Sequence, residues 1–164
     1  MDNAVIITGS SGAIGSAIVN QFKKNNFFVI GLDQCMPTDV TPDVFINIDL
    51  GLFTSNSEYR ENKYIEISAC VSDKSLELLI NNAASQILDT GTYSDLDSFL
   101  TMQSINALAP LALYIAFKDS LVNAQGSMIN IGSIHSTLTK LGFTGYAASK
   151  ASLRSITKSL AIES

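Results

Sequence analysis

The sequence has few of the residues that build disulfide-linked, metal-bound or highly charged proteins. Two cysteines, Cys35 and Cys70, are too few for a disulfide framework, and together with the single histidine they do not form a metal-ligand set. Charged residues make up 15% of the chain, well below the share of about 25% that is usual. Acidic residues outnumber basic ones by 15 to 10, and the resulting net charge of −5 argues against a general nucleic-acid-binding protein.

Long hydrophobic segments are also missing. The acidic start, residues 1–3, precedes only four apolar residues, so we expect no secretion signal. The longest apolar stretch, residues 105–117, is too short to span a bilayer and contains an asparagine and a proline, so we expect no membrane span. Hydrophobic residues make up 46% and the mean hydropathy is +0.25, which excludes a disordered chain. We therefore expect a soluble, cytoplasmic protein whose 164 residues form a single domain, 1–164.

Apolar runs alternate with segments of helical periodicity along the chain. The runs predict strands at 4–7, 27–32, 44–48, 76–80 and 127–131, and the periodic segments predict helices at 14–24, within 55–74, at 94–122 with a break or kink at Pro110, and at 146–162. This order predicts an α/β fold with a doubly wound parallel sheet of the Rossmann type. Such sheets bind ligands at the carboxyl ends of their strands, where polar residues gather in this sequence: Gly9, Asp33, Asp49, Asn81 and Ser133.

A glycine-rich loop, Thr8 to Gly15, joins the first strand to the first helix. Small residues let the backbone approach a pyrophosphate, and a helix N-terminus offers free N–H groups and a favourable dipole. The alternative is a tight turn that serves only close packing of helix on sheet. The first interpretation predicts cofactor contacts at Gly9, Ser11, Gly12, Ile14 and Gly15.

An acidic residue follows the second strand and favours the cofactor interpretation. Asp33 lies 24 residues after Gly9, where a carboxylate can accept hydrogen bonds from the ribose hydroxyls of an adenosine. The same carboxylate repels a 2′-phosphate, and Gln34 offers no positive charge, so NAD is favoured over NADP. Asp49 could accept from an adenine amino group or be a solvated loop acid.

A tyrosine and a lysine lie one helical turn apart in the last predicted helix. Tyr146 and Lys150 have the Y-x-x-x-K spacing, which places a phenol and an ammonium on one helix face. A cation beside a phenol favours its ionised form, which suits the phenol to proton transfer near neutral pH. The same spacing occurs at Tyr59 and at Tyr114, where helix-surface packing is the simpler interpretation. Ser133 distinguishes the Tyr146 pair, because its hydroxyl follows the fifth strand and can reach the same pocket.

These motifs together resemble the short-chain dehydrogenase/reductase family, in the spacings of its classical branch. The resemblance runs from residue 4 to 164 and rests on the loop TGSSGAIG, the segment Asn81-Asn82-Ala83, Asn106, Ser133 and the Tyr146/Lys150 pair. It implies an NAD(P)-dependent oxidoreductase that interconverts a carbonyl and a secondary alcohol.

The resemblance also implies a role for each site residue. Tyr146 is the general acid/base, Lys150 binds the nicotinamide ribose, and Ser133 orients the substrate oxygen. Asn106 holds a water that links Lys150 to solvent, although it could be an ordinary polar helix residue. Asn82 and Ala83 line the cofactor side of the sheet.

The sequence departs from the family pattern in its glycine loop and in its length. Ala13 stands where the classical branch has its middle glycine, and the resulting spacing also fits the extended branch, whose members often act on nucleotide sugars. The chain ends with the catalytic helix, where a typical member continues with further strands and the substrate loop. We therefore expect a fragment of a longer enzyme or a truncated product with an open sheet edge. A non-catalytic dinucleotide-binding protein and a remnant that does not fold alone stay open as alternatives.

Two further expectations concern the surface. His135, two residues past Ser133, is either an exposed loop imidazole or a substrate contact at the mouth of the pocket. The apolar helices at 105–117 and 147–162 pack between subunits in the family, which implies a homodimer or homotetramer, whereas the simpler interpretation makes both of them core.

Overall fold

Five of the apolar runs form one parallel sheet. The structure is a computed structural model that describes residues 2–92 and 95–163. Within these residues the strands are β1 Asn3–Thr8, β2 Phe28–Asp33, β3 Val44–Asn47, β4 Ser75–Asn81 and β5 Ser127–Asn130, in the order β3-β2-β1-β4-β5. All pairs are parallel, which confirms the predicted doubly wound, Rossmann-type sheet.

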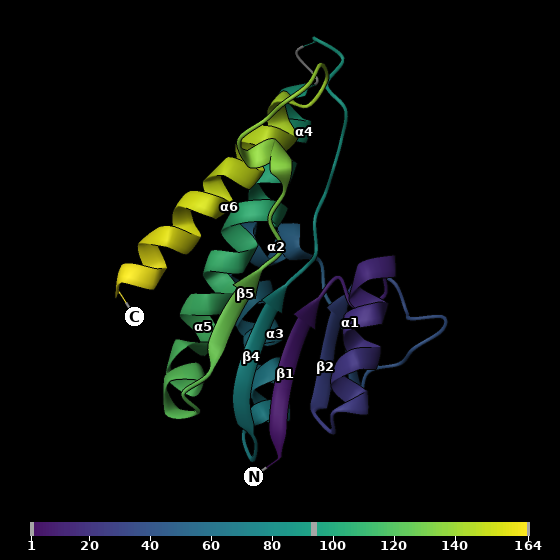
Figure 1. The fold of residues 1–164 in the computed structure, drawn as a ribbon, viewed down its shortest axis with the longest axis vertical. Coiled ribbons are helices and arrows are strands. Elements are labelled where there is room, and N and C mark those ends of the chain that lie inside the picture. Colours follow the sequence, from purple (N-terminus) through teal and green to yellow (C-terminus); the bar gives the residue numbers. More distant parts are fainter. Residues whose placement is uncertain (1, 93–94, 164) are drawn as a thin grey trace.

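Helices cover both faces of this sheet (Figure 1). They are α1 Ala13–Lys24, α2 Leu50–Ser55, α3 Ser57–Val71, α4 Asp95–Gln103, α5 Ala109–Asn123 and α6 Thr144–Glu163, with a π-helical turn η1 at Ser104–Leu108 and a 3₁₀ turn η2 at Ile134–Ser136. Alternate strand residues enter two cores, as expected for strands buried on both faces. The larger core joins the sheet to α2, α3 and α5, and the smaller one joins it to α1.

The region predicted to be helical in part, 55–74, contains the whole of α3 and only the last residue of α2. The Asp49 carboxylate caps the start of α2, so helical structure begins five residues before the predicted region. The Asn56 side chain accepts from the backbone N–H of Tyr59 and starts α3 directly afterwards. Side-chain capping at two positions therefore divides the segment.

A π-turn precedes Pro110, where the sequence predicts a break or kink. The start of the predicted helix at Ser94 lies outside the described residues, and α4, η1 and α5 follow one another without a gap from Asp95. Pro110 stands in the first turn of α5, where a residue without an N–H is tolerated.

Taken as one helix, Asp95–Asn123 is long and apolar enough to cross a membrane by length and composition, unlike the shorter stretch seen in the sequence. Its α5 part contacts β4 and buries Leu113 and Phe117 in the larger core, which is the packing of a core helix.

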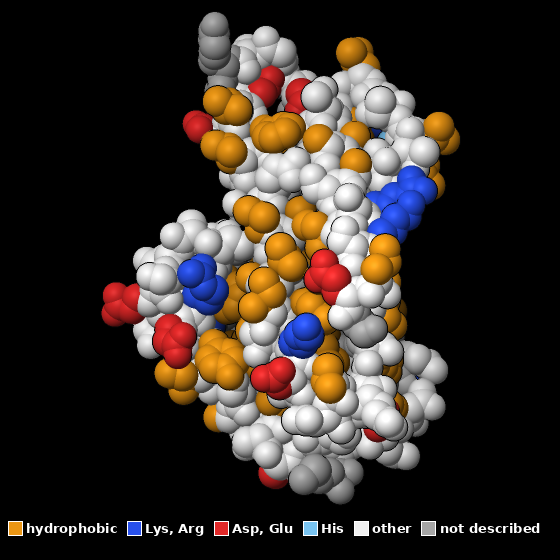
Figure 2. All heavy atoms as spheres, turned by 90° about the vertical axis from the view of Figure 1, so that its left-hand side faces the viewer, with side chains coloured by type: hydrophobic (Ala, Val, Ile, Leu, Met, Phe, Trp, Pro, Cys, Tyr) orange, Lys and Arg blue, Asp and Glu red, His pale blue; other side chains and the backbone are white. Residues whose placement is uncertain are grey.

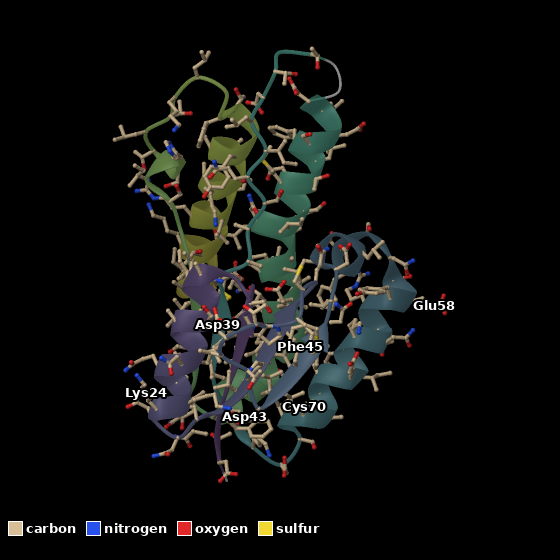
Figure 3. All side chains as sticks on the ribbon, turned by 90° about the vertical axis from the view of Figure 1, so that its right-hand side faces the viewer. Lys24, Asp39, Asp43, Phe45, Glu58 and Cys70 are labelled. Atoms are coloured by element: carbon tan, nitrogen blue, oxygen red, sulfur yellow. The ribbon has the colours of Figure 1, made fainter. Side chains whose placement is uncertain are left out.

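The edges of the sheet are β3 and β5. Asp43, labelled in Figure 3, lies just before β3. It accepts hydrogen bonds from Lys23 Nζ and from the backbone N–H of Val29, both at 2.8 Å, and so ties this edge to α1. At the other edge Ile129 of β5 is 42% exposed. Among the described strands β5 pairs only with β4, so the open edge expected at the fifth strand is present. Above the carboxyl ends of the strands rise α4, the start of α6 and the segments 82–92 and 131–143 (Figure 1).

Candidate active site

A cleft of 590 Å³ opens at the carboxyl ends of β1, β2 and β4. Because β1 pairs with both β2 and β4, the chain changes direction across the sheet at this point, where doubly wound sheets bind ligands. The residues that line the cleft are Gly9, Gly12, Ala13, Ile14, Gly15, Leu32, Asp33, Gln34, Ile48, Leu50, Asn82, Ala83, Ala84, Ser85 and Ile105.

The glycine loop passes through this cleft with no room for side chains at two positions. Gly9 has a φ of +65°, and a Cβ there would lie 2.8 Å from the Cα of Ala83. A Cβ on Gly15 would lie 1.9 Å from the carbonyl oxygen of Gly9. No side chain caps α1 at Gly12, so the N-terminal N–H groups of the helix face the cleft without competition from a cap.

Asp33 holds the glycine loop against the end of β2. One carboxylate oxygen accepts from the backbone N–H of Ser11 at 2.9 Å, and the other accepts from that of Cys35 at 3.1 Å. The Ser11 hydroxyl donates to the carbonyl of Cys35 at 2.6 Å. The two predicted residues are therefore bonded to each other; of the two, Asp33 lines the cleft and keeps lone pairs for further donors.

Asp49 has a different position from the other predicted cofactor residues. Its neighbours Ile48 and Leu50 line the cleft. Asp49 itself accepts from the backbone N–H of Leu52 at 3.0 Å as the cap of α2. Its backbone N–H donates to the phenol of Tyr59 at 2.8 Å. The structure thus gives Asp49 a folding role, and its contact with adenine stays a prediction.

Asn82 fastens the end of β4 to the glycine loop. Its amide nitrogen donates to the carbonyls of Thr8 and Gly9 at 3.1 and 3.0 Å. The buried hydroxyl of Thr8 accepts from the backbone N–H groups of Asn82 and Ala83, each at 3.0 Å. Thr8, whose role the sequence reasoning missed, therefore helps to fix the cleft.

Lys150 brings an ammonium group into the protein interior. The side chain lies in α6 and is 3% exposed, and Nζ donates to the carbonyl of Ile131 at 2.8 Å. Burial lowers the pKa of Lys150 below its ordinary value. Nζ lies 6.0 Å from the centre of the Tyr146 ring, so the spacing of this pair brings phenol and ammonium together as predicted.

Tyr146 is half-buried and belongs to a cluster of rings. Its ring centre lies 5.9 Å from that of Phe143 and 6.2 Å from that of His135. Ser133 caps η2, and its hydroxyl accepts from the backbone N–H of His135 at 3.1 Å. Within the described residues no hydrogen bond joins Ser133 to Tyr146, but both are in direct contact with His135.

Asn106 is fully buried in the π-turn, where it connects the cleft to α6. Its amide nitrogen donates to the carbonyl of Ser85 at 2.8 Å and to the hydroxyl of Ser149 at 2.9 Å. Its amide oxygen accepts from the backbone N–H of Ser85 at 2.7 Å. Both amide hydrogens are thus used, but the amide oxygen keeps a second lone pair, and the water between Asn106 and Lys150 stays a prediction. Ser85 and Ser149 were missed in the sequence, although Ser149 lies inside the Tyr146/Lys150 motif.

In the described part of the chain no three His, Cys, Asp or Glu residues are grouped in a way that could hold a metal ion. The arrangement therefore offers a glycine-lined cleft, a buried ammonium beside a phenol, and hydrogen-bonding groups at the strand ends.

The family model for short chain dehydrogenases matches residues 51–164, and the chain belongs to this family. The short-chain dehydrogenase virD of Hypocrea virens is 28% identical over 163 residues, which cover 96% of this chain and 55% of that protein. The 3-oxoacyl-[acyl-carrier-protein] reductase FabG of Buchnera aphidicola is 27% identical over 165 residues, covering 99% and 58%.

A solved oxidoreductase of the same family from Brucella ovis, in complex with a partially ordered NAD, is 26% identical with a TM-score of 0.85. The match covers 99% of this chain and 78% of that one. The chain thus spans little more than half the length of the two curated relatives.

Proposed function

We propose that the chain carries the cofactor-binding and acid–base groups of an NAD(P)-dependent oxidoreductase that interconverts a carbonyl compound and a secondary alcohol. The observation that carries the proposal is the buried Lys150 ammonium, which has one carbonyl partner and lies beside the Tyr146 ring. A buried cation is costly, and a role in binding and proton transfer accounts for its presence. The small-molecule substrate is a carbonyl compound in one direction and an alcohol in the other.

The cleft fits a nicotinamide dinucleotide. At Gly9 and Gly15 the backbone approaches neighbouring backbone too closely for a Cβ, as a cradle for a pyrophosphate requires. Ser11, Gly12 and Ile14 belong to the same loop and helix start, and Asn82 and Ala83 form the opposite wall. The bound cofactor supplies or accepts the hydride.

Asp33 favours NAD over NADP. Its carboxylate can accept from ribose hydroxyls and repels a 2′-phosphate, and its cleft-lining neighbour Gln34 carries no charge. Asp49 remains our candidate for the adenine amino group.

Tyr146 moves the proton in the proposed reaction. In the reducing direction its hydroxyl donates a proton to the substrate oxygen as hydride reaches the carbon, and the Lys150 ammonium stabilises the phenolate that remains. The Ser133 hydroxyl donates to the same substrate oxygen and orients it. Asn106 acts through Ser85 and Ser149 and is a positioning residue.

Fluorescence titration with NADH and the Tyr146→Phe variant test this proposal. We expect NADH binding in both proteins, and carbonyl reduction only in the wild type, because phenylalanine removes the proton donor and keeps the ring packing. Equal turnover by the variant would end the catalytic assignment. Binding without turnover in the wild type would favour a non-catalytic dinucleotide-binding protein.

We also propose a homodimer or homotetramer in the cytoplasm that binds neither nucleic acid nor membrane. Figure 2 shows hydrophobic side chains spread over the face that α5 and α6 occupy. Ile115, Val122 and Ile162 are exposed on these helices. Association would bury this apolar surface, and a monomer mass that does not change with concentration would contradict it.

A further inference from the structure

His135 has a fixed place beside the phenol of Tyr146. The imidazole centre lies 4.7 Å from the Phe143 ring and 6.2 Å from the Tyr146 ring, and those two rings also contact each other. The Phe143 ring is buried. The backbone N–H of His135 donates to Ser133 Oγ. His135 therefore contacts both residues to which the proposed function assigns the substrate oxygen.

The contacts of the imidazole define which of its nitrogens is available. Nδ1 lies 2.9 Å from the carbonyl oxygen of Leu138. Because a carbonyl oxygen only accepts, Nδ1 carries the hydrogen of the neutral ring, and Nε2 keeps its lone pair. Across residues 2–92 and 95–163, no side chain or backbone group is hydrogen-bonded to Nε2. The proposed mechanism does not use this nitrogen either.

The side chains beside His135 in sequence are either apolar or already hydrogen-bonded: Ser136 Oγ donates to the carbonyl of Ser133, and Thr137 Oγ1 accepts from Arg154. Ile134 is 73% exposed and Leu138 is 69% exposed. Nε2 is thus an acceptor without a hydrogen-bond partner among the described residues, whereas the neighbouring hydroxyls of Ser136 and Thr137 already have partners. A site with such an acceptor discriminates against substrates that bring no donor, because the acceptor then loses its partner on binding.

We propose that His135 is a specificity-determining residue whose Nε2 accepts a hydrogen bond from a hydroxyl on the carbon next to the reacting carbon. The substrate class is then α-hydroxy ketones and the corresponding vicinal diols. This inference rests on the proposed function, since Ser133 and Tyr146 fix the reacting oxygen beside the imidazole.

The kinetic test compares hydroxyacetone with acetone, which lacks only the neighbouring hydroxyl. The ratio of their kcat/KM values is measured with NADH for the wild type and for His135→Phe, which keeps the ring and removes the nitrogens. Comparing the ratios cancels the different intrinsic reactivities of the ketones. We expect the ratio to fall about five- to tenfold in the variant, mainly through KM for hydroxyacetone. His135→Asn restores an acceptor and should recover part of the ratio, whereas a ratio unchanged by His135→Phe overturns the inference.

A second measurement does not depend on turnover. His135 is the only histidine in the chain, so its imidazole nitrogen resonances need no assignment. In weakly alkaline buffer we expect the tautomer with hydrogen on Nδ1. With NADH bound, propylene glycol should shift the Nε2 resonance and isopropanol should not. The opposite tautomer, or an equal response to both alcohols, overturns the inference. Failure to reduce either ketone counts against the proposed function alone, and this titration then decides the role of His135.

Discussion

The buried ammonium of Lys150 lowers the stability of the fold, whereas the proposed activity requires it. The side chain is 3% exposed and bonds one carbonyl oxygen, and none of the ion pairs among the described residues includes it. Lys150→Met replaces it with an apolar side chain of similar length. We expect this variant to be more stable than the wild type at neutral pH and inactive in carbonyl reduction.

The expected gain follows from two opposing contributions. Burying an unpaired ammonium costs several kcal/mol even after relaxation of the protein, and the charge-assisted hydrogen bond to Ile131 returns about 1.5–3 kcal/mol. The Met variant removes both but leaves the half-buried Ile131 carbonyl without this partner, so its free energy of unfolding should rise by only about 1 kcal/mol. For a chain of this size each kcal/mol raises Tm by about 2–4 °C.

The difference in free energy of unfolding between Lys150→Met and the wild type should also depend on pH. Burial lowers the pKa of Lys150 in the folded state below the ordinary value of 10.5 that it has in the unfolded chain. Between these two values the unfolded chain binds more protons, so the stability of the wild type gains from this group as the pH rises. The Met variant lacks this contribution. Its advantage is therefore largest at neutral pH and shrinks as the pH approaches 10.5.

Urea unfolding followed by circular dichroism at neutral and alkaline pH measures both effects. Lys158→Met, at an exposed lysine of the same helix, is the matched control and should change stability little at either pH. A Lys150→Met protein that is less stable than the wild type at neutral pH would refute the reasoning. An advantage that is independent of pH would show that the lysine pKa is not lowered by folding.

Three other substitutions test the cleft. Gly15→Ala should destabilise the fold by about 3 kcal/mol in thermal unfolding, because its Cβ would lie 1.9 Å from the carbonyl oxygen of Gly9. The control Gly12→Ala, whose Cβ would lie 3.5 Å from the same atom, should fold normally. Equal stability of the two variants would contradict the close packing at Gly15. Asn106→Leu leaves the backbone N–H and C=O of Ser85 without their partner. It should lower the free energy of unfolding in urea by about 2–5 kcal/mol, and a loss below about 1 kcal/mol would contradict the structural role of these hydrogen bonds. Asp33→Ser should lower the ratio of NADH to NADPH affinity at least about tenfold in a fluorescence titration, and an unchanged ratio removes Asp33 from cofactor selection.

The strands were predictable because each is a short apolar run that ends in a polar residue or glycine. β1 to β5 all lie within a residue or two of the predicted ranges. The helix boundaries near residue 50 were not predicted, because hydrophobic periodicity does not register a cap. The side chains of Asp49 and Asn56 each cap the start of a helix. From the sequence alone, either residue could equally have belonged to a loop.

In the candidate site, too, some features could be predicted from the sequence and others could not. A local motif such as Tyr146 and Lys150 at one helical turn can be read from spacing, because a helix fixes the geometry of nearby residues. The hydrogen bonds from the Asn106 side chain to Ser85 and Ser149 join residues that are 21 and 43 positions apart in the sequence. Such contacts depend on how elements pack, and the sequence alone does not give that packing.

The attachment of α6 explains how a distant part of the chain can set the position of the proposed acid–base tyrosine. Three of the hydrogen bonds that join side chains of this helix to the rest of the fold hold it to the π-turn and to the end of β5. Ser149 is bonded by Asn106 of the π-turn at 2.9 Å, Lys150 donates to the backbone just after β5 at 2.8 Å, and Thr157 accepts from Asn130 of β5 at 2.8 Å. Two of these contacts lie within one turn of the phenol and the third lies three turns away, so they restrain both the position and the tilt of the helix. Because every partner belongs to the described residues, the geometry that pairs phenol with ammonium is fixed by contacts inside the chain.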